Sequence, residues 1–177
     1  MNRTDRRWIL PSAIVALAWV FALTEIQIEG AAGWAASLPT WRIEHHPLLD
    51  LFWGGRPLTG YHTGMFLFMF MVFHLGFFLH ARPSWRLEAR VLGSLMVFWI
   101  CEDFFWFVLN PAFGLKHFDP DNVPWHRHWW AGVPSDYILF LAAGASLLVY
   151  SFRRRKATAS SATGEAGLPI APEDRAR

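Results

Sequence analysis

The sequence predicts an all-α fold: a polytopic membrane protein built as a four-transmembrane-helix bundle. The composition supports this, because 54% of the 177 residues are hydrophobic and only 17% are charged, and the chain has 11 Trp and 16 Phe. About 20 apolar residues are needed to cross a bilayer as a helix. Four apolar runs have about that length, and basic residues lie at alternate ends of them. The runs cover residues 8–28, 61–80, 91–109 and 135–152.

The four runs differ in composition. The first could be read as a secretory signal, but it is long for one, so we expect a retained helix. The second is rich in Phe and Met, and the third contains two adjacent acidic residues. The fourth is the shortest, yet its small residues at 142–146 allow close packing against a neighbouring helix. We therefore expect one transmembrane domain over residues 1–156 and a disordered cytoplasmic tail over residues 157–177.

The basic residues predict the orientation. They lie before the first run, between the second and third, and after the fourth: Arg3, Arg6, Arg7, Arg82, Arg86, Arg90, Arg153, Arg154, Arg155 and Lys156. By the positive-inside rule these segments and both termini are cytoplasmic, in a plasma (inner) membrane of bacterial type. No nucleic acid partner is implied, because these basic clusters match the insertion rule. The lipid bilayer is the expected partner, together with a membrane protein partner or a second copy in a homo-oligomer.

The two remaining connections, residues 29–60 and 110–134, are expected to be long outward loops. They are rich in tryptophan, with Trp34, Trp41, Trp53, Trp125, Trp129 and Trp130. Indole rings prefer the headgroup region of a membrane, so we expect these loops to lie along its surface and to roof the bundle. Residues 46–53 predict a short interfacial helix, with Pro47 in its first turn.

The third run carries an organised polar stripe. At about 100° per residue, five of its residues fall within an arc of roughly 100° on one helix face. They are Trp99, Glu102, Asp103, Trp106 and Asn110. A carboxylate deep in a membrane helix costs on the order of 2.5–3.5 kcal/mol on insertion scales, and such groups usually face the interior of the protein. We expect Glu102 and Asp103 to point inward, in the outer half of the bundle.

Other ionisable residues are expected at the same level. Glu25 lies near the outer end of the first run, with Glu29 one turn further on the same side, and His62 begins the second run. His126 and His128 lie in the second loop, on either side of Arg127. Carboxylates and imidazoles together are ligands for zinc, iron, manganese or copper. The predicted metal ligands are therefore Glu102, Asp103, His62, His126, His128 and Glu25, and the predicted substrate-binding or charge-balancing residues are Arg127, Asn110 and Trp106.

Other cofactors and redox schemes are disfavoured. Haem in a helix bundle needs paired histidines, whereas His74 is isolated in the inner half of its run. Cys101 is the only cysteine, which excludes an intramolecular disulfide and chemistry that requires a thiol pair.

Three functions fit these residues, and the sequence names no reaction. The first is a metal-binding protein, as an enzyme acting on a small or lipid-borne substrate. The second is a proton- or cation-coupled transporter that uses Glu102, Asp103 and Glu25. The third is an accessory or scaffold subunit, in which Arg127, Lys116 or His126 closes an ion pair with Glu102 or Asp103.

Overall fold

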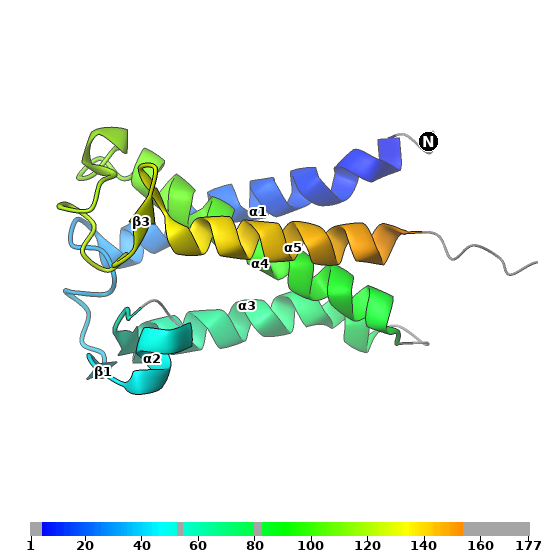
Figure 1. The fold of residues 1–177 in the computed structure, drawn as a ribbon, viewed down its shortest axis with the longest axis horizontal. Coiled ribbons are helices and arrows are strands. Elements are labelled where there is room, and N and C mark those ends of the chain that lie inside the picture. Colours follow the sequence, from blue (N-terminus) through cyan, green and yellow to red (C-terminus); the bar gives the residue numbers. More distant parts are fainter. Residues whose placement is uncertain (1–4, 53–54, 80–82, 154–177) are drawn as a thin grey trace, which may run out of the picture.

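A computed structural model describes residues 5–52, 55–79 and 83–153, and this part of the chain is mostly helical. Its four long helices are α1 (Asp5–Glu29), α3 (Gly60–Phe78), α4 (Trp85–Leu109) and α5 (Ser135–Phe152), and α4 crosses the others obliquely (Figure 1). Within the described residues, three segments are long and apolar enough to cross a membrane, namely Trp8–Glu29, Trp85–Leu109 and Ser135–Phe152. This indicates a membrane protein. α3 coincides with most of the predicted second span, whose last two residues it does not include, and the fourth span stays a prediction.

The ends of these helices are distributed as the sequence predicts. The start of α1, the end of α3, the start of α4 and the end of α5 lie at one end of the molecule, and the two long connections lie at the other (Figure 1). We call these the helix-turn end and the loop end. Arg86, Arg90 and Arg153 lie at the helix-turn end. The other basic residues of the predicted clusters, or their side chains, are outside the part of the chain that the structure describes. The predicted tail at 157–177 is also outside it.

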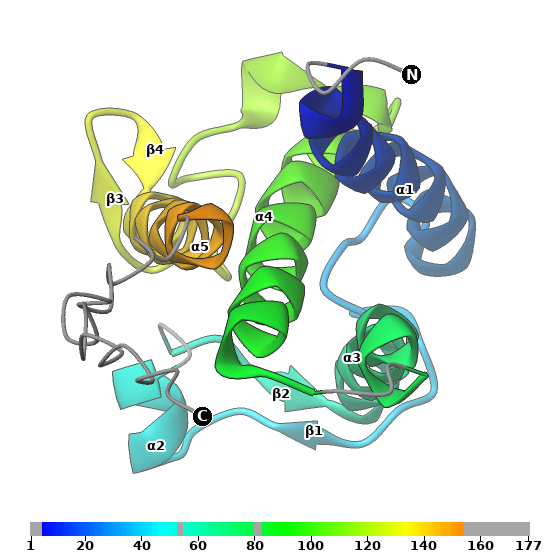
Figure 2. The same cartoon turned by 90° about the vertical axis from the view of Figure 1, so that its right-hand side faces the viewer.

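The central helix is α4, which contacts α1, α3 and α5. Figure 2 shows α5 on one side of α4 and α1 and α3 on the other. The contact between α4 and α5 is close because it involves two glycines. A Cβ atom at Gly93 would lie 2.8 Å from the carbonyl oxygen of Gly144, and one at Gly144 would lie 3.1 Å from that of Gly93. The small residues of the fourth run therefore fix how α5 sits on α4.

Local capping sets the limits of α4. The side chain of Ser84 accepts a hydrogen bond from the backbone N–H of Leu87, so the helix begins six residues before the predicted start at residue 91. At the other end, Asn110 donates from Nδ2 to the carbonyl oxygen of Gly30 and accepts from the N–H of Ala112. Pro111 follows, which disfavours continuation of the helix. Asn110 thus ties the ends of α4 and α1 together.

The first connection contains a short helix and a two-stranded ladder. α2 (Pro47–Phe52) begins at the predicted proline, whereas Trp53 lies outside the described residues. β1 (Arg42–Ile43) pairs antiparallel with β2 (Leu58–Thr59), with Arg42 opposite Thr59. This ladder places Thr59, which immediately precedes α3, beside Arg42.

The second connection contains a single 3₁₀ turn, η1 (Leu115–His117), and a hairpin of β3 (Trp129–Trp130) with β4 (Val133–Pro134). Trp41 and Trp130 are exposed, as expected for indoles at a membrane surface. Trp34 and Trp125 instead pack into the protein. Trp125 packs against a buried cluster that includes Trp106 and Phe107. Part of the predicted tryptophan belt is therefore core, because these loops fold over the end of the bundle.

Candidate functional site

A cavity of about 600 Å³ lies at the loop end of the bundle. All four long helices and both connections contribute to its walls. Among the described residues, two groups of polar side chains line or adjoin it. We call them the carboxylate–histidine cluster, consisting of Glu25, Glu29, His62 and Glu102, and the ion-pair cluster, consisting of Arg56, Asp103, His126, Asp136 and Tyr137.

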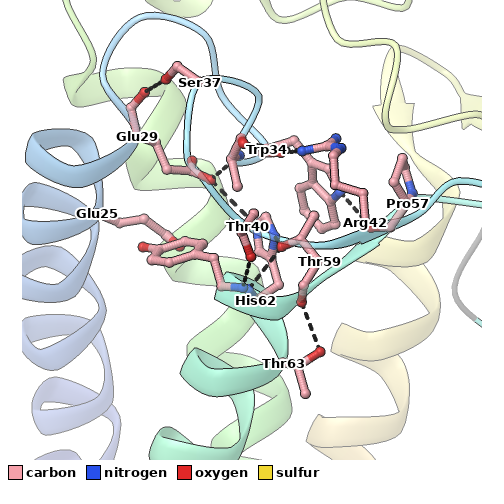
Figure 3. A network of polar contacts seen from close by, with 12 residues as sticks. Glu25, Glu29, Trp34, Ser37, Thr40, Arg42, Pro57, Thr59, His62 and Thr63 are labelled. Atoms are coloured by element: carbon pink, nitrogen blue, oxygen red, sulfur yellow. Dashed lines mark hydrogen bonds and ion pairs between the residues drawn. The ribbon is translucent and has the colours of Figure 1, made fainter.

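The carboxylate–histidine cluster places three potential ligand atoms close together. Glu25, Glu29 and His62 are all buried, and each offers an atom within 4.8 Å of those offered by the other two. Nε2 of His62 lies 3.5 Å from Oε1 of Glu29 (Figure 3). The Glu102 carboxyl group of α4 faces that of Glu25 closely enough for the two to share a proton. Three carboxyl groups and one imidazole therefore meet between α1, α3 and α4.

The sequence around His62 orients its ring. Thr59 precedes α3 and acts as its cap, because its hydroxyl accepts a hydrogen bond from the backbone N–H of His62 at 3.1 Å. The same hydroxyl lies 2.7 Å from Nδ1 of the imidazole. Nδ1 is thus held by the protein, and Nε2 faces the carboxylates. An imidazole held through one nitrogen and free at the other is the usual arrangement of a metal ligand.

The turn after α1 covers the cluster. Its residues Gly33, Trp34 and Ala35 have positive φ angles of 64°, 44° and 53°, a region that L residues with side chains rarely adopt. The turn places the Trp34 indole on the His62 ring, with centroids 4.0 Å apart. It also lets the N–H of Ala35 donate to Oε1 of Glu29 at 2.6 Å (Figure 3). Backbone strain is concentrated where the chain approaches the cluster, as it often is at functional sites.

Arg42 supports this turn from outside. Its Nη1 donates to the carbonyl oxygens of Trp34 and Ala35 at 3.2 and 3.1 Å. Its Nε pairs with Glu44 at 3.0 Å. Arg42 thereby stabilises the backbone that carries the donor to Glu29, without itself pairing with an acid of the cluster.

The geometry can accept a metal ion with small adjustment. Two ligand atoms on one tetrahedral ion, with bonds of about 2.0–2.2 Å, lie about 3.3–3.6 Å apart. Ligand atoms that lie within 4.8 Å of one another would therefore have to approach by at most about 1.5 Å. Within the described residues, none of Glu25, Glu29 and Glu102 forms a salt bridge with Lys or Arg. Oε1 of Glu102 is buried and has no hydrogen-bond partner there.

The ion-pair cluster has a different character, because its charges are matched. Asp103 accepts from the hydroxyl of Tyr137 and from Nε2 of His126, the latter at 3.1 Å. Arg56 forms a salt bridge with Asp136 and a 2.8 Å hydrogen bond with Nδ1 of His126. The cluster joins α4 and α5 to both connections.

These contacts assign the protonation of His126. A guanidinium group can only donate, so Nδ1 of His126 accepts from Arg56 and Nε2–H donates to Asp103. Burial lowers the pKa of His126, and the positive charge of Arg56 adds to this, against the opposing influence of Asp103. His126 is therefore neutral, and both of its nitrogens have protein partners, which leaves neither free for a metal.

The predicted site residues fall into separate groups. Glu25, His62 and Glu102 come together, whereas Asp103 and His126 meet in the ion-pair cluster. This happens because adjacent helix residues point about 100° apart, so Glu102 faces α1 while Asp103 faces α5. His74, in the inner half of α3, is bonded through Nδ1 to the carbonyl oxygen of Phe70 and through Nε2 to Glu88.

Other predicted residues lie at the edge of the cavity or away from it. His128 is exposed at its edge, and Trp106 lines it. Arg127 is exposed and lies beside Gly55, and Asn110 caps α4; neither is part of the cavity wall.

Four polar residues of this region were not among the predicted metal ligands or charge-balancing residues. Glu29 had a signal, its spacing of four residues from Glu25. Asp136 and Tyr137 had a weaker one, their position at the start of the fourth run. Arg56 had none, because it lies in an irregular connection.

Comparison of the chain with protein-family models, with curated proteins and with solved structures gives no match.

Proposed function

We propose that this chain is an integral membrane metalloenzyme that binds one divalent transition metal ion through Glu25, Glu29 and His62. The observation that supports the proposal is the proximity of three buried ligand atoms, within 4.8 Å of one another, on two apolar helices. The carboxyl group of Glu102 stands beside them. The chain would span the membrane four times, with the metal in the outer half of the bundle.

A bound cation explains the charge of the cluster. Buried carboxylates are costly unless they are paired or coordinate a metal. The described residues supply no Lys or Arg salt bridge to the three acids, so a divalent ion is the simplest compensating charge. Zinc, iron, manganese and copper all accept carboxylate and imidazole ligands. With two carboxylates and one imidazole, the set favours iron(II), manganese or zinc over copper.

The arrangement also suits catalysis. Three protein ligands leave coordination positions open, as catalytic metal sites do. Such positions take water or a substrate oxygen, whose proton the ion makes easier to remove. Glu102 lies close to the ligands and has a carboxylate oxygen with no partner in the described part of the chain, and this oxygen would receive that proton. The cavity beside it gives room for a small or lipid-borne substrate.

The ion-pair cluster supports a second, structural role for part of the predicted site. Asp103 is bonded to His126 and Tyr137, and Arg56 joins His126 to Asp136. A scaffold is expected to have such a buried network, in which His126, one of the three partners considered from the sequence, pairs with Asp103, and Arg56 pairs with Asp136. We assign it to holding the loops in place. A transport role would need Asp103 available to a cargo ion, whereas here its carboxylate is engaged by two neighbours.

The test is metal binding by the detergent-purified protein. After chelation and addition of iron(II), manganese or zinc, elemental analysis should find about one ion per chain. Glu29→Gln should lower the affinity at least tenfold, because it removes a charged ligand. Glu44→Gln is the matched control, since Glu44 is an exposed acid paired with Arg42, and it should bind normally. Folded wild-type protein that takes up no ion would contradict the proposal.

A further inference from the structure

The cavity has two chemically different ends. Its loop end is polar and contains the carboxylate–histidine cluster. Its other end is lined by apolar side chains from three helices: Phe66, Phe70, Leu95, Ile100, Leu139 and Phe140. Leu95 lies seven residues before Glu102 on α4, which is about 10 Å along the helix. The cavity therefore continues from the polar cluster as an apolar groove along the middle of α4.

This groove is accessible from the side of the bundle. Figure 2 shows α3 and α5 on different sides of α4, and the groove between them is lined by all three helices. Leu139 of α5 is 69% exposed and Phe70 of α3 is 39% exposed. In a membrane, residues at this level are surrounded by lipid chains. A molecule dissolved in the bilayer would reach the groove directly.

Two buried polar atoms in the cavity wall have no partner among the described residues. They are Oε1 of Glu102, an acceptor, and Nε1 of Trp106, a donor. Both residues are at least 96% buried, with exposures of 3% and 4%. They are one helical turn apart on α4, so their Cβ atoms are about 5–6 Å apart. Leaving both atoms unbonded is unfavourable, and a single group that accepts and donates would satisfy them.

We propose that the ligand of this site is a membrane-borne long-chain alcohol, with its hydroxyl between Trp106 and Glu102 and its chain in the groove. This inference rests on the proposed function, because it names the substrate class of the same metal site. A hydroxyl group accepts from the indole N–H and donates to the carboxylate. An ammonium group could not accept from the indole, and an anionic headgroup would face three carboxyl groups.

The experiment uses the full chain in lipid nanodiscs with a photoreactive 16-carbon alcohol, and a photoreactive alkane of the same length as the matched probe. Cross-linking is located by peptide mass spectrometry. We expect the alcohol to label groove peptides of α3 and α5 at least tenfold more than the alkane does. Excess hexadecanol should abolish the labelling, and hexadecane should not.

Two pairs of variants sharpen the test. Trp106→Phe keeps an aromatic ring but removes the N–H, and should reduce labelling by the alcohol at least fivefold. Trp130→Phe, at an exposed position outside the cavity, is its control. Leu95→Trp should block the groove, whereas Leu67→Trp, on an exposed face of α3, should not. The wild-type competition decides the question if a variant does not fold.

The outcomes separate this inference from the proposed function. Metal content is measured on the same samples. Equal labelling by alcohol and alkane in protein that binds metal would overturn the alcohol site and leave the metal site standing. Selective labelling by the alcohol in protein that binds no metal would overturn the metal site and support the alcohol site.

Discussion

Glu102 and Asp103 are neighbours in α4, yet they belong to two clusters of opposite character. Asp103 is surrounded by partners that match its charge, namely His126 and Tyr137, with Arg56 close behind. Glu102 faces another acid and has an oxygen without a hydrogen-bond partner among the described residues. Buried charges that are fully paired hold a structure together, and breaking such a pair is costly. Buried acids without cations indicate a ligand that the protein chain does not supply. The comparison therefore separates the part of the site that holds the loops from the part that binds.

The largest expected effect is on the ion-pair cluster. Arg56→Met should lower the free energy of unfolding by about 3 kcal/mol, because it leaves Asp136 and His126 without their shared donor. Lys116→Met, at an exposed position, should leave it nearly unchanged. Unfolding in mixed detergent, followed by circular dichroism, measures both. Equal stability of the two variants would show that the paired cluster does not hold the loops.

The next largest effect is stabilisation by the metal. At a free metal concentration of 100 times Kd, binding to the folded state adds about 2.7 kcal/mol to the free energy of unfolding. Wild type should gain this stability when metal is added and lose it on chelation. At the same concentration Glu29→Gln should gain at most about 1.4 kcal/mol, because its affinity is at least tenfold lower. An undiminished gain in Glu29→Gln would place the ion elsewhere.

Neutralising the two adjacent acids should have effects of opposite sign in metal-free protein. Glu102→Gln should stabilise it by about 1 kcal/mol, because the amide removes a buried charge and can donate to Glu25. Asp103→Asn should destabilise it by about 2 kcal/mol, because it removes the charged acceptor of His126 and Tyr137. Equilibrium unfolding without metal is the measurement. The same sign for both variants would remove the distinction between the clusters.

The smallest expected effect is on pH dependence. His126 has a lowered pKa in the folded protein because it is buried, so it stays neutral there while an unfolded histidine binds a proton near pH 6.5. Its contribution to stability is complete above pH 6.5 and is lost as the pH falls below it, by at most about 1.4 kcal/mol per pH unit.

Replacing His126 tests this directly. Four ionisable side chains face the ring of His126, namely Asp103, Asp136, Tyr137 and Arg56. His126→Asn should make the free energy of unfolding less dependent on pH between pH 7 and pH 5. His45→Asn, at an exposed position, is the control and should keep the wild-type slope. If His126→Asn also keeps that slope, the ring is already protonated in the fold.

Much of the architecture follows from local sequence. Hydropathy located the three helices that are long and apolar enough to cross a membrane, and charge placed the two long connections at one end. The short helix at Pro47 follows from its proline and apolar residues, and the convergence of Glu25, His62 and Glu102 follows from their depth in the helices. Each of these features depends on the composition and length of a single segment.

The division between the clusters depends on information that no single segment contains. The rotation of α4 decides which neighbour each acid faces, and it is set by contacts such as that between Gly93 and Gly144. The role of His126 as a neutral partner of Asp103 depends on the hydrogen bond from Arg56 to its Nδ1, which the sequence does not reveal. Asn110 lies on the polar stripe, yet it caps a helix because the stripe continues past the end of α4. The strained turn at Trp34 likewise has no sequence signal.

The most direct test of the central claim compares two histidines that the sequence offered equally as ligands. Metal stoichiometry is measured by elemental analysis of wild type, His62→Ala and His126→Ala, each purified and shown to be folded. The account predicts about one ion per chain in wild type and His126→Ala, and loss of the ion in His62→Ala. Retention of metal in His62→Ala, or its loss only in His126→Ala, would contradict a metal centre at Glu25, Glu29 and His62.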